Sequence, residues 1–167
     1  MDLTDRDLRR LHNEDWGFDS NCFVCEPRND RGLQVPFFHD RSRDVVVAAF
    51  SLGDRFSGAP SYVHGGVTLA VLDEAMAWAT ITIGGKFAVT AETTTRFLRP
   101  VLVGKTYTVE AQLTAQTPEQ IEAVAQVTFG EGKVCAEATA RFSILGEAQA
   151  RHATGADVTT IDPSFLR

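Results

Sequence analysis

Hydrophobic and polar residues alternate with a period of two in the second half of the chain, over residues 89–98, 106–113, 121–129 and 134–144. Successive side chains of a strand point to opposite faces, so each stretch predicts a β-strand with one buried face. Short polar turns at 117–119 and 130–132 separate the last three stretches. Because connections this short join antiparallel neighbours, the pattern predicts an antiparallel sheet.

A different pattern lies before these strands, between His64 and Gly84. This segment is rich in Ala and Leu and carries apolar residues on every side of a helical wheel, which predicts a buried helix of about five turns. Upstream, residues 33–39 and 45–51 predict two short strands separated by a polar turn. One long helix against one antiparallel sheet is an α+β fold.

The two ends of the chain are more polar than its middle. Leu3, Leu8 and Leu11 have a rough helical spacing, so we expect a short amphipathic helix within residues 1–21. The last twenty or so residues have little pattern and predict a surface tail. With 167 residues in total, we expect an N-terminal extension over 1–21, a single domain over 22–145 and a C-terminal tail over 146–167.

The composition excludes several classes of protein. The formal net charge of -6 disfavours a nucleic-acid-binding protein, which would need a basic surface. The first residues lack the apolar stretch of a secretion signal, and no run is long and apolar enough to span a membrane, so we expect a cytoplasmic protein. Cys22, Cys25 and Cys135 are too few, and odd in number, for a disulfide scaffold.

Two adjacent acids, Asp73 and Glu74, are the only charged residues of the apolar helix. An ionised carboxylate in a buried position costs several kcal/mol unless another group pairs with it. Adjacent helical residues are about 100° apart, so the two acids face different neighbours. A functional carboxylate at Asp73 and a structural hydrogen bonder are both open at this point.

Gly65 and Gly66 begin the same helix, where backbone N–H groups lack helical acceptors and can bind an anion or a developing oxyanion. A tight turn alone would also explain the two glycines. Gly66 and Asp73 are about 10.5 Å apart along the axis, so one helix cannot easily bring both to one carbonyl carbon. Two antiparallel helices of a two-fold dimer can, which predicts a site shared between two subunits.

These residues carry a family resemblance. The segments His64-Gly65-Gly66, Asp73-Glu74-Ala75-Met76 and Arg96-Phe97-Leu98-Arg99-Pro100 resemble the hotdog-fold acyl-CoA thioesterases of the PaaI type. Upstream, Cys22-Phe23-Val24-Cys25, Asn29, Gly32-Leu33 and Gly58-Ala59-Pro60 are also similar to that family, so the resemblance covers about residues 22–145.

The resemblance implies a hotdog fold, with an antiparallel sheet wrapped around the long helix. It assigns the catalytic carboxylate to Asp73, as general base or nucleophile, and the oxyanion donor to the N–H of Gly66. It implies an acyl-CoA substrate, no cofactor, a site at the interface of a homodimer, and a tetramer built from two dimers.

Three positions distinguish this chain from branches of the family. Where some members have Asn or Gln before the HGG segment, this chain has Ser57 and Gly58, so that role is vacant or falls to Ser61. One branch has a hydroxyl one turn after the acid, where this chain has Ala77. Thr90 fits the strand hydroxyl of another branch and is the second catalytic candidate, although Thr is also an ordinary strand former.

The remaining candidates have both functional and structural interpretations. We include His64, Gly65 and Ser61 among the substrate-binding residues, although His64 fits a structural role at the start of the helix better. Arg96 and Arg99, with Lys105, could meet the phosphates of coenzyme A or be solvated strand charges. Glu74 is interpreted as a structural acid. Cys22 and Cys25 lack two further ligands, so we expect no metal site.

The sequence therefore predicts a thioester hydrolase acting on an acyl-CoA. The alternative is a non-enzymatic acyl-CoA-binding or regulatory protein with the same fold. A hydratase or dehydratase is a third interpretation, but this sequence lacks the second motif that its chemistry would need. The acyl group stays open, because Met76, Trp78 and Phe87 could line an acyl pocket or belong to the core.

Overall fold

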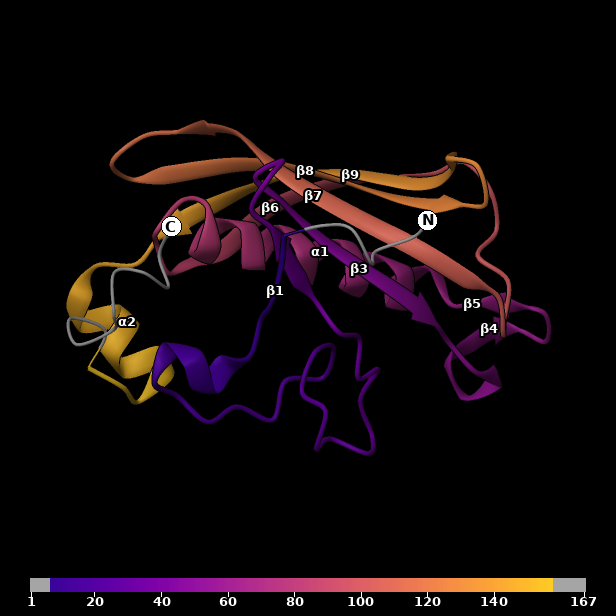
Figure 1. The fold of residues 1–167 in the computed structure, drawn as a ribbon, viewed down its shortest axis with the longest axis horizontal. Helices are drawn as coiled ribbons and strands as arrows, with labels where there is room; N and C mark the ends of the chain where they lie inside the picture. The colour runs from indigo at the N-terminus through magenta and orange to yellow at the C-terminus, as the bar shows by residue number, and fades with distance from the viewer. Residues whose placement is uncertain (1–6, 158–167) are drawn as a thin grey trace.

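The computed structural model describes residues 7–157. One long helix, α1 (Gly65–Thr82), lies along a sheet with the strand order β1-β2-β3-β7-β8-β9-β6, in which every neighbouring pair is antiparallel (Figure 1). The α+β prediction is confirmed. The strands of this sheet are β1 Leu8–Arg10, β2 Phe38–Asp40, β3 Val45–Ser51, β6 Ala88–Phe97, β7 Thr106–Gln116, β8 Gln120–Phe129 and β9 Lys133–Ile144.

Small elements complete the described part. They are the 3-10 helices η1 (Asn13–Trp16) and η2 (Asp54–Phe56), the hairpin of β4 (Ser57–Ala59) and β5 (Tyr62–Val63), and the helix α2 (Glu147–Thr154). The hairpin leads directly into α1, so it sets where that helix begins.

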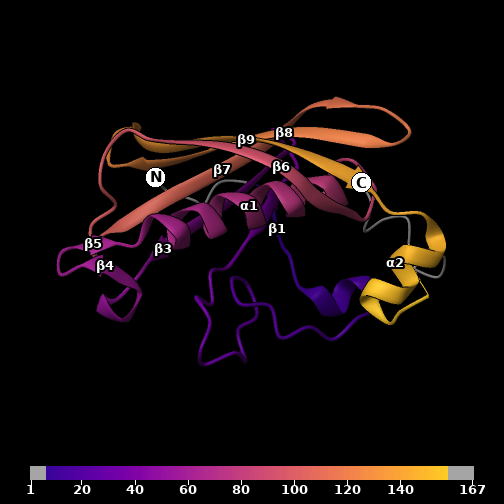
Figure 2. The ribbon, with the colours of Figure 1, turned by 180° about the vertical axis from the view of Figure 1, so that it is seen from behind.

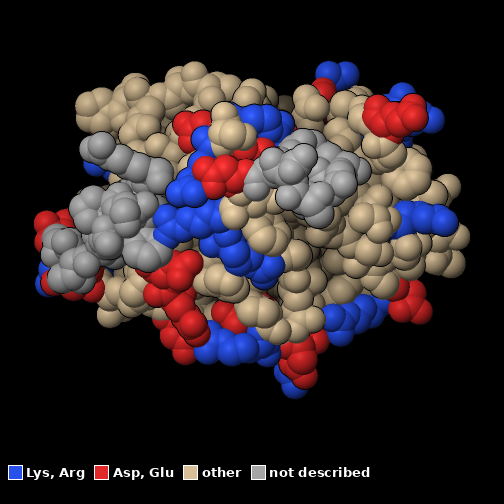
Figure 3. All heavy atoms as spheres, viewed as in Figure 1, with Lys and Arg blue, Asp and Glu red and all other residues tan. Residues whose placement is uncertain are grey.

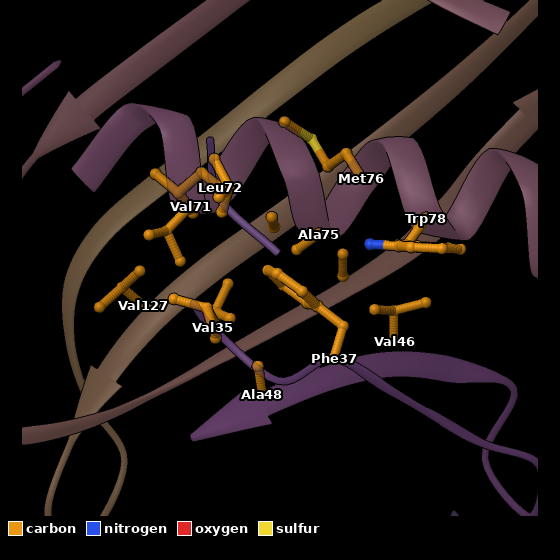
Figure 4. Close-up of a cluster of buried hydrophobic side chains, with 14 of the residues drawn as sticks. Val35, Phe37, Val46, Ala48, Val71, Leu72, Ala75, Met76, Trp78 and Val127 are labelled. Carbon is orange, nitrogen blue, oxygen red and sulfur yellow. The ribbon is translucent and has the colours of Figure 1, made fainter. Parts of the chain in front are cut away.

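The core lies between α1 and the sheet. Burial follows the period of two seen in the sequence: in β8, Ile121, Ala123, Ala125 and Val127 are buried, whereas Glu122 and Gln126 are exposed. Figure 4 shows side chains of α1 pointing toward apolar residues of β3 and of the segment before β2. Met76 and Trp78 are buried in this cluster, which places them in the core.

The N-terminal segment differs from the prediction. Leu8–Arg10 is a strand paired with β2 instead of part of an amphipathic helix, and between residues 7 and 21 the one helical turn is η1. Pairing satisfies backbone groups that a short isolated helix would leave to water, and Leu11 and Trp16, which follow the strand, are buried. The part of the predicted helix before Asp7, with Leu3, lies outside the described residues.

Two other segments also differ from the sequence prediction. Of residues 33–39, only the last two belong to a strand, β2. Within the predicted tail, residues 147–154 form α2, where Gln149 Oε1 accepts the N–H of Gly146 at 3.1 Å and Ala150 is buried. This helix is only two turns long. Its amphipathic pattern is therefore too short to stand out from the polar residues around it.

The N-terminal loop covers the side of α1 that faces away from β6–β9. Figures 1 and 2 show α1 between this part of the sheet and the segment that joins η1 to β2. Backbone hydrogen bonds from Leu33 to Phe23 (2.7 Å) and from Val35 to Val24 (2.8 Å) close this loop on itself. The loop therefore presents residues 22–25 to the helix as a fixed turn.

The surface view mixes the two signs of charge. In Figure 3, Lys and Arg side chains lie among Asp and Glu on the face shown. Several are paired: Arg43 bridges the buried Asp40 and Glu110, with nitrogen–oxygen distances of 2.8 Å to each. None of the helices described combines the length and apolarity needed to cross a lipid bilayer.

Candidate functional site

The structure brings two predicted catalytic residues into contact. The Thr90 hydroxyl donates a hydrogen bond of 2.8 Å to Oδ1 of Asp73. Asp73 lies in the middle of α1 and is half-buried, and Thr90 lies on the edge strand β6 and is exposed. The contact fixes one carboxylate oxygen toward the strand and leaves the other oxygen without a hydrogen bond to the described residues.

His64 caps the start of α1. Its Nδ1 accepts the N–H of Gly66 at 2.9 Å, and its carbonyl oxygen accepts the N–H groups of Val67 and Thr68. Because Nδ1 accepts, it carries no proton in this arrangement. The N–H of Gly66, the predicted oxyanion donor, is thus occupied by a side chain of the same turn.

Two glycines approach the His64 ring closely. A side chain at Gly66 would come within 3.2 Å of the His64 Nδ1 atom, and one at Gly58 within 3.1 Å of its Cδ2 atom. Gly58 stands where some members of the resembled family have a polar side chain. A larger residue there would require His64 to shift by a few tenths of an ångström.

Gly66 and Asp73 do not meet in one chain. They lie seven residues apart on the same helix, about 10.5 Å along its axis. A thioester carbonyl held at Gly66 is therefore out of reach of Asp73 of the same subunit.

A surface groove of about 250 Å³ lies beside the first turn of α1. Its lining is largely apolar and includes Tyr62, Val63, Phe97, Leu98 and Pro100, with Gly65 at the helix end. Ser61 lies exposed in the turn of the β4–β5 hairpin, next to this lining.

The predicted phosphate-binding arginines are engaged within the chain. Arg96 forms an exposed ion pair with Glu137 at 2.9 Å, and Arg99 donates to the carbonyl oxygen of Val134 at 2.6 Å. Arg99 also lines the groove. Arg96 lies six residues from Thr90 along β6, about 20 Å for an extended strand, so it is remote from Asp73 of its own chain.

Glu74 faces a different neighbour, the turn that holds Cys22 and Cys25. Cys22 Sγ lies 3.3 Å from Glu74 Oε1. Burial raises the pKa of Glu74 from 4.5 to about 8, and the nearby Cys22 and Asp73 charges add to this shift. The sequence does not indicate that the cysteine pair and Glu74 meet. Its only signals are two cysteines close together in a loop and an acid within an apolar helix.

Cys22, Cys25 and Glu74 form the one group of three metal-type donors found among the described residues. Their donor atoms all lie within 4.8 Å of one another. Zinc sites in proteins usually have four ligands, so this group is one short of a closed structural site.

Comparison with known proteins finds one matching family model and several similar folds. Residues 61–136 match the family model of the thioesterase superfamily, a segment that contains His64, Gly66, Asp73 and Thr90. No curated protein matches the chain. A solved thioesterase superfamily protein is 26% identical, with a TM-score of 0.70 over 78% of this chain. The present chain spans only 64% of the length of that neighbour.

Two further neighbours share the fold at lower identity. A hypothetical thioesterase from Streptococcus pneumoniae, solved with coenzyme A, is 19% identical, with a TM-score of 0.58 over 61% of this chain and 79% of its own. Other structures of that protein carry one aspartate or one threonine replaced by alanine. The Escherichia coli PaaI protein of the phenylacetic acid degradation operon is 23% identical, with a TM-score of 0.57 over 62% of this chain and 74% of its own. The present chain therefore has the hotdog fold of these neighbours, and its residues 61–136 match the thioesterase superfamily model.

Proposed function

We propose that this protein hydrolyses the thioester bond of an acyl-CoA at a site formed by two copies of the chain. The hydrogen bond between Thr90 and Asp73 carries the proposal. It holds a carboxylate in one orientation on an accessible side of a largely apolar helix. A residue that only stabilised the fold would not need a charge at this position. The solved neighbour with coenzyme A supports this choice of ligand.

Strand β6 supports the second copy. It ends the sheet, and most of its residues are exposed on both faces. Val89 and Phe97 expose 49% and 55% of their surface. An unpaired edge strand of ten residues with exposed apolar groups is a ready surface for pairing with another strand. In a two-fold dimer through β6, the partner's helix start supplies the Gly66 N–H that Asp73 lacks.

The chemistry follows from the free oxygen of Asp73. Thr90 holds Oδ1, and the other oxygen accepts a proton from water as the water oxygen attacks the thioester carbon. The carbonyl oxygen gains negative charge and binds the Gly66 N–H once the His64 ring turns away. Collapse of this intermediate breaks the carbon–sulfur bond, and the leaving thiolate takes the proton that Asp73 accepted. Direct attack by Asp73, with later hydrolysis of the anhydride, uses the same atoms.

The groove beside Gly65 is the proposed place for the apolar part of the ligand. Met76 and Trp78 are in the core and leave no space for an acyl chain there. Arg99 at the groove, and Lys105 six residues later in the chain, are the proposed contacts for the phosphates, since an acidic protein needs local cations to bind a phosphorylated ligand.

The alternative is an acyl-CoA-binding protein without turnover. The contact of His64 with Gly66 favours it, because a donor that stays bound to its own helix cap cannot polarise a carbonyl.

The test is hydrolysis of a panel of aryl, short-chain and long-chain acyl-CoAs by Asp73→Asn and Asp73→Ala. We expect kcat to fall by roughly 100-fold or more with the fold intact, as for loss of a general base. Asp30→Asn, which changes an exposed aspartate of the N-terminal loop, is the matched control and should keep the parent rate. Unchanged rates in both Asp73 variants refute the assignment, and binding without hydrolysis by the parent protein supports the alternative.

A further inference from the structure

The cysteine turn and Glu74 form a chemical site separate from the Asp73–Thr90 pair. Cys22 and Glu74 are 52 positions apart in the sequence, yet their side chains meet at 3.3 Å across the interface of the N-terminal loop and α1. Asp73 contacts Thr90 on β6, so the two acids serve different sides of the helix. The function proposed above uses neither cysteine nor Glu74.

The loop fixes this turn firmly. The Asn29 amide donates to the carbonyl oxygens of Asn21 (3.2 Å) and Cys22 (3.4 Å). Gly32 passes so close that an added side chain would meet the carbonyl oxygen of Phe23 at 2.5 Å. Asn29 and Gly32 are therefore scaffold residues that hold the Cys-x-x-Cys turn against the helix.

The two thiols have different surroundings. Cys22 is partly exposed, and its Sγ accepts backbone N–H groups from Val24 (3.3 Å) and Cys25 (3.4 Å). Cys25 is only 8% exposed and lies behind it, where it contacts the Asn13 amide at 3.8 Å. Backbone N–H groups directed at a sulfur stabilise the thiolate, which is the nucleophilic form.

We propose that Cys22 and Cys25 are a redox-active dithiol that exchanges with low-molecular-weight disulfides, with Cys22 as the attacking thiolate, Cys25 as the resolving thiol and Glu74 as the proton carrier. The proposal rests on residues 22, 25 and 74 alone and does not depend on thioesterase activity.

The protonation states agree with this assignment. A hydrogen bond from Cys25, followed by those from the backbone, lowers the pKa of Cys22 from 9.0 to about 5. The same bond and burial raise the pKa of Cys25. With the pKa of Glu74 raised to about 8, the site at neutral pH holds a Cys22 thiolate, a Cys25 thiol and a protonated Glu74. The other charged groups that influence it are Arg10, beside Cys25, and Asp73, beside Glu74.

The exchange balances in two steps. The Cys22 thiolate attacks the disulfide RSSR, forms a mixed disulfide and releases RS⁻, which takes the proton of Glu74. The mixed disulfide removes the Cys22 charge that favoured protonated Glu74, so the carboxylate can accept the proton of Cys25. Cys25 then attacks Cys22 Sγ and expels the second RS⁻. The protein dithiol loses two electrons, and the small disulfide is reduced to two thiols.

The test uses the full chain with Cys135→Ser, which leaves only the two cysteines of the turn, and oxidised glutathione as the probe. Intact mass should show loss of two hydrogens and no retained glutathione, and peptide mapping should give a Cys22–Cys25 disulfide. Adding Cys25→Ser should trap one glutathione, whereas adding Cys22→Ser should leave the protein unmodified over the same time.

The acid is tested by Glu74→Gln, which should form the mixed disulfide but resolve it at least about tenfold more slowly, as for loss of a proton acceptor. Glu26→Gln, at a buried glutamate of the same loop that binds Arg28, is the matched control. Peptide mapping of the Cys22–Cys25 disulfide in the unaltered chain tests the proposal even if a variant fails to fold. Equal reactivity of the two cysteines, no disulfide after treatment, or thiols protected by a bound zinc ion overturns the proposal.

Discussion

The contact between Cys22 and Glu74 predicts an unusual pH dependence of stability. Glu74 has a pKa of about 8 in the folded chain against an ordinary 4.5, so the folded state holds a proton that the unfolded state has lost. Its contribution to the free energy of unfolding is complete below pH 4.5 and is lost as the pH rises through about 8.

Cys22 acts in the opposite direction. Its pKa is about 5 in the folded chain against an ordinary 9.0, so the unfolded state holds the extra proton. Its contribution is complete above pH 9 and is lost as the pH falls through about 5. Between pH 5 and 8 the two effects oppose each other, because the fold moves a proton from the thiol to the carboxyl without changing the net charge of the pair.

Replacing one of the two residues should reveal how the other changes the free energy of unfolding with pH. Each unbalanced proton changes the free energy of unfolding by at most about 1.4 kcal/mol per pH unit. Relative to the parent, Glu74→Gln should become more stable as the pH rises from 5 to 8, and Cys22→Ser should become less stable over that range. Burial is the largest cause of the Glu74 shift, so much of its slope survives loss of Cys22.

The assay is urea unfolding at fixed protein concentration, followed by tryptophan fluorescence from pH 5 to 8 under reducing conditions. Cys135→Ser controls for removal of a buried thiol outside the cluster. If the free energy of unfolding of both variants changes with pH as it does in the parent, folding does not move a proton from Cys22 to Glu74.

Three further predictions concern the helix and its edge strand. Thr90→Val, which removes the hydroxyl but keeps the branched shape, should lower kcat by about 10- to 100-fold, the value of a hydrogen bond to a charged group, while Thr90→Ser should be close to the parent. In an Asp73→Asn background the same change should have almost no further effect, and equal losses in both backgrounds would show that Thr90 acts independently. Phe97→Glu, at an exposed apolar position of β6, should shift the protein from dimer to monomer in sedimentation and reduce hydrolysis with it; an active monomer contradicts the shared site. Met76→Ala should reduce the free energy of unfolding by about 2–5 kcal/mol in urea titrations, because Met76 is fully buried, and a loss below about 1 kcal/mol would contradict its place in the core.

The sequence by itself determined the sheet and the helix. The alternation in residues 121–129, broken only at Val124, and the largely apolar segment before Gly84 are local signals, and each reflects which face of an element must leave water. Asp73 was a candidate for a similar reason, since a carboxylate within such a segment needs a partner.

Local patterns failed where long-range pairing decided the structure. Leu8 and Leu11 have helical spacing, but β2 supplies hydrogen-bond partners for Leu8–Arg10 that no neighbouring residue in the sequence could announce. The helix α2 was missed because two turns give too little periodicity to separate it from a polar tail.

Only the tertiary structure decided which groups meet. It showed that Thr90 orients Asp73, that His64 occupies the N–H of Gly66, and that Glu74 belongs with Cys22 instead of with its neighbour Asp73. Side-chain contacts depend on how an 18-residue helix is rotated between the sheet and the N-terminal loop. That rotation is fixed by the packing of the whole core, and no single segment of the sequence contains it.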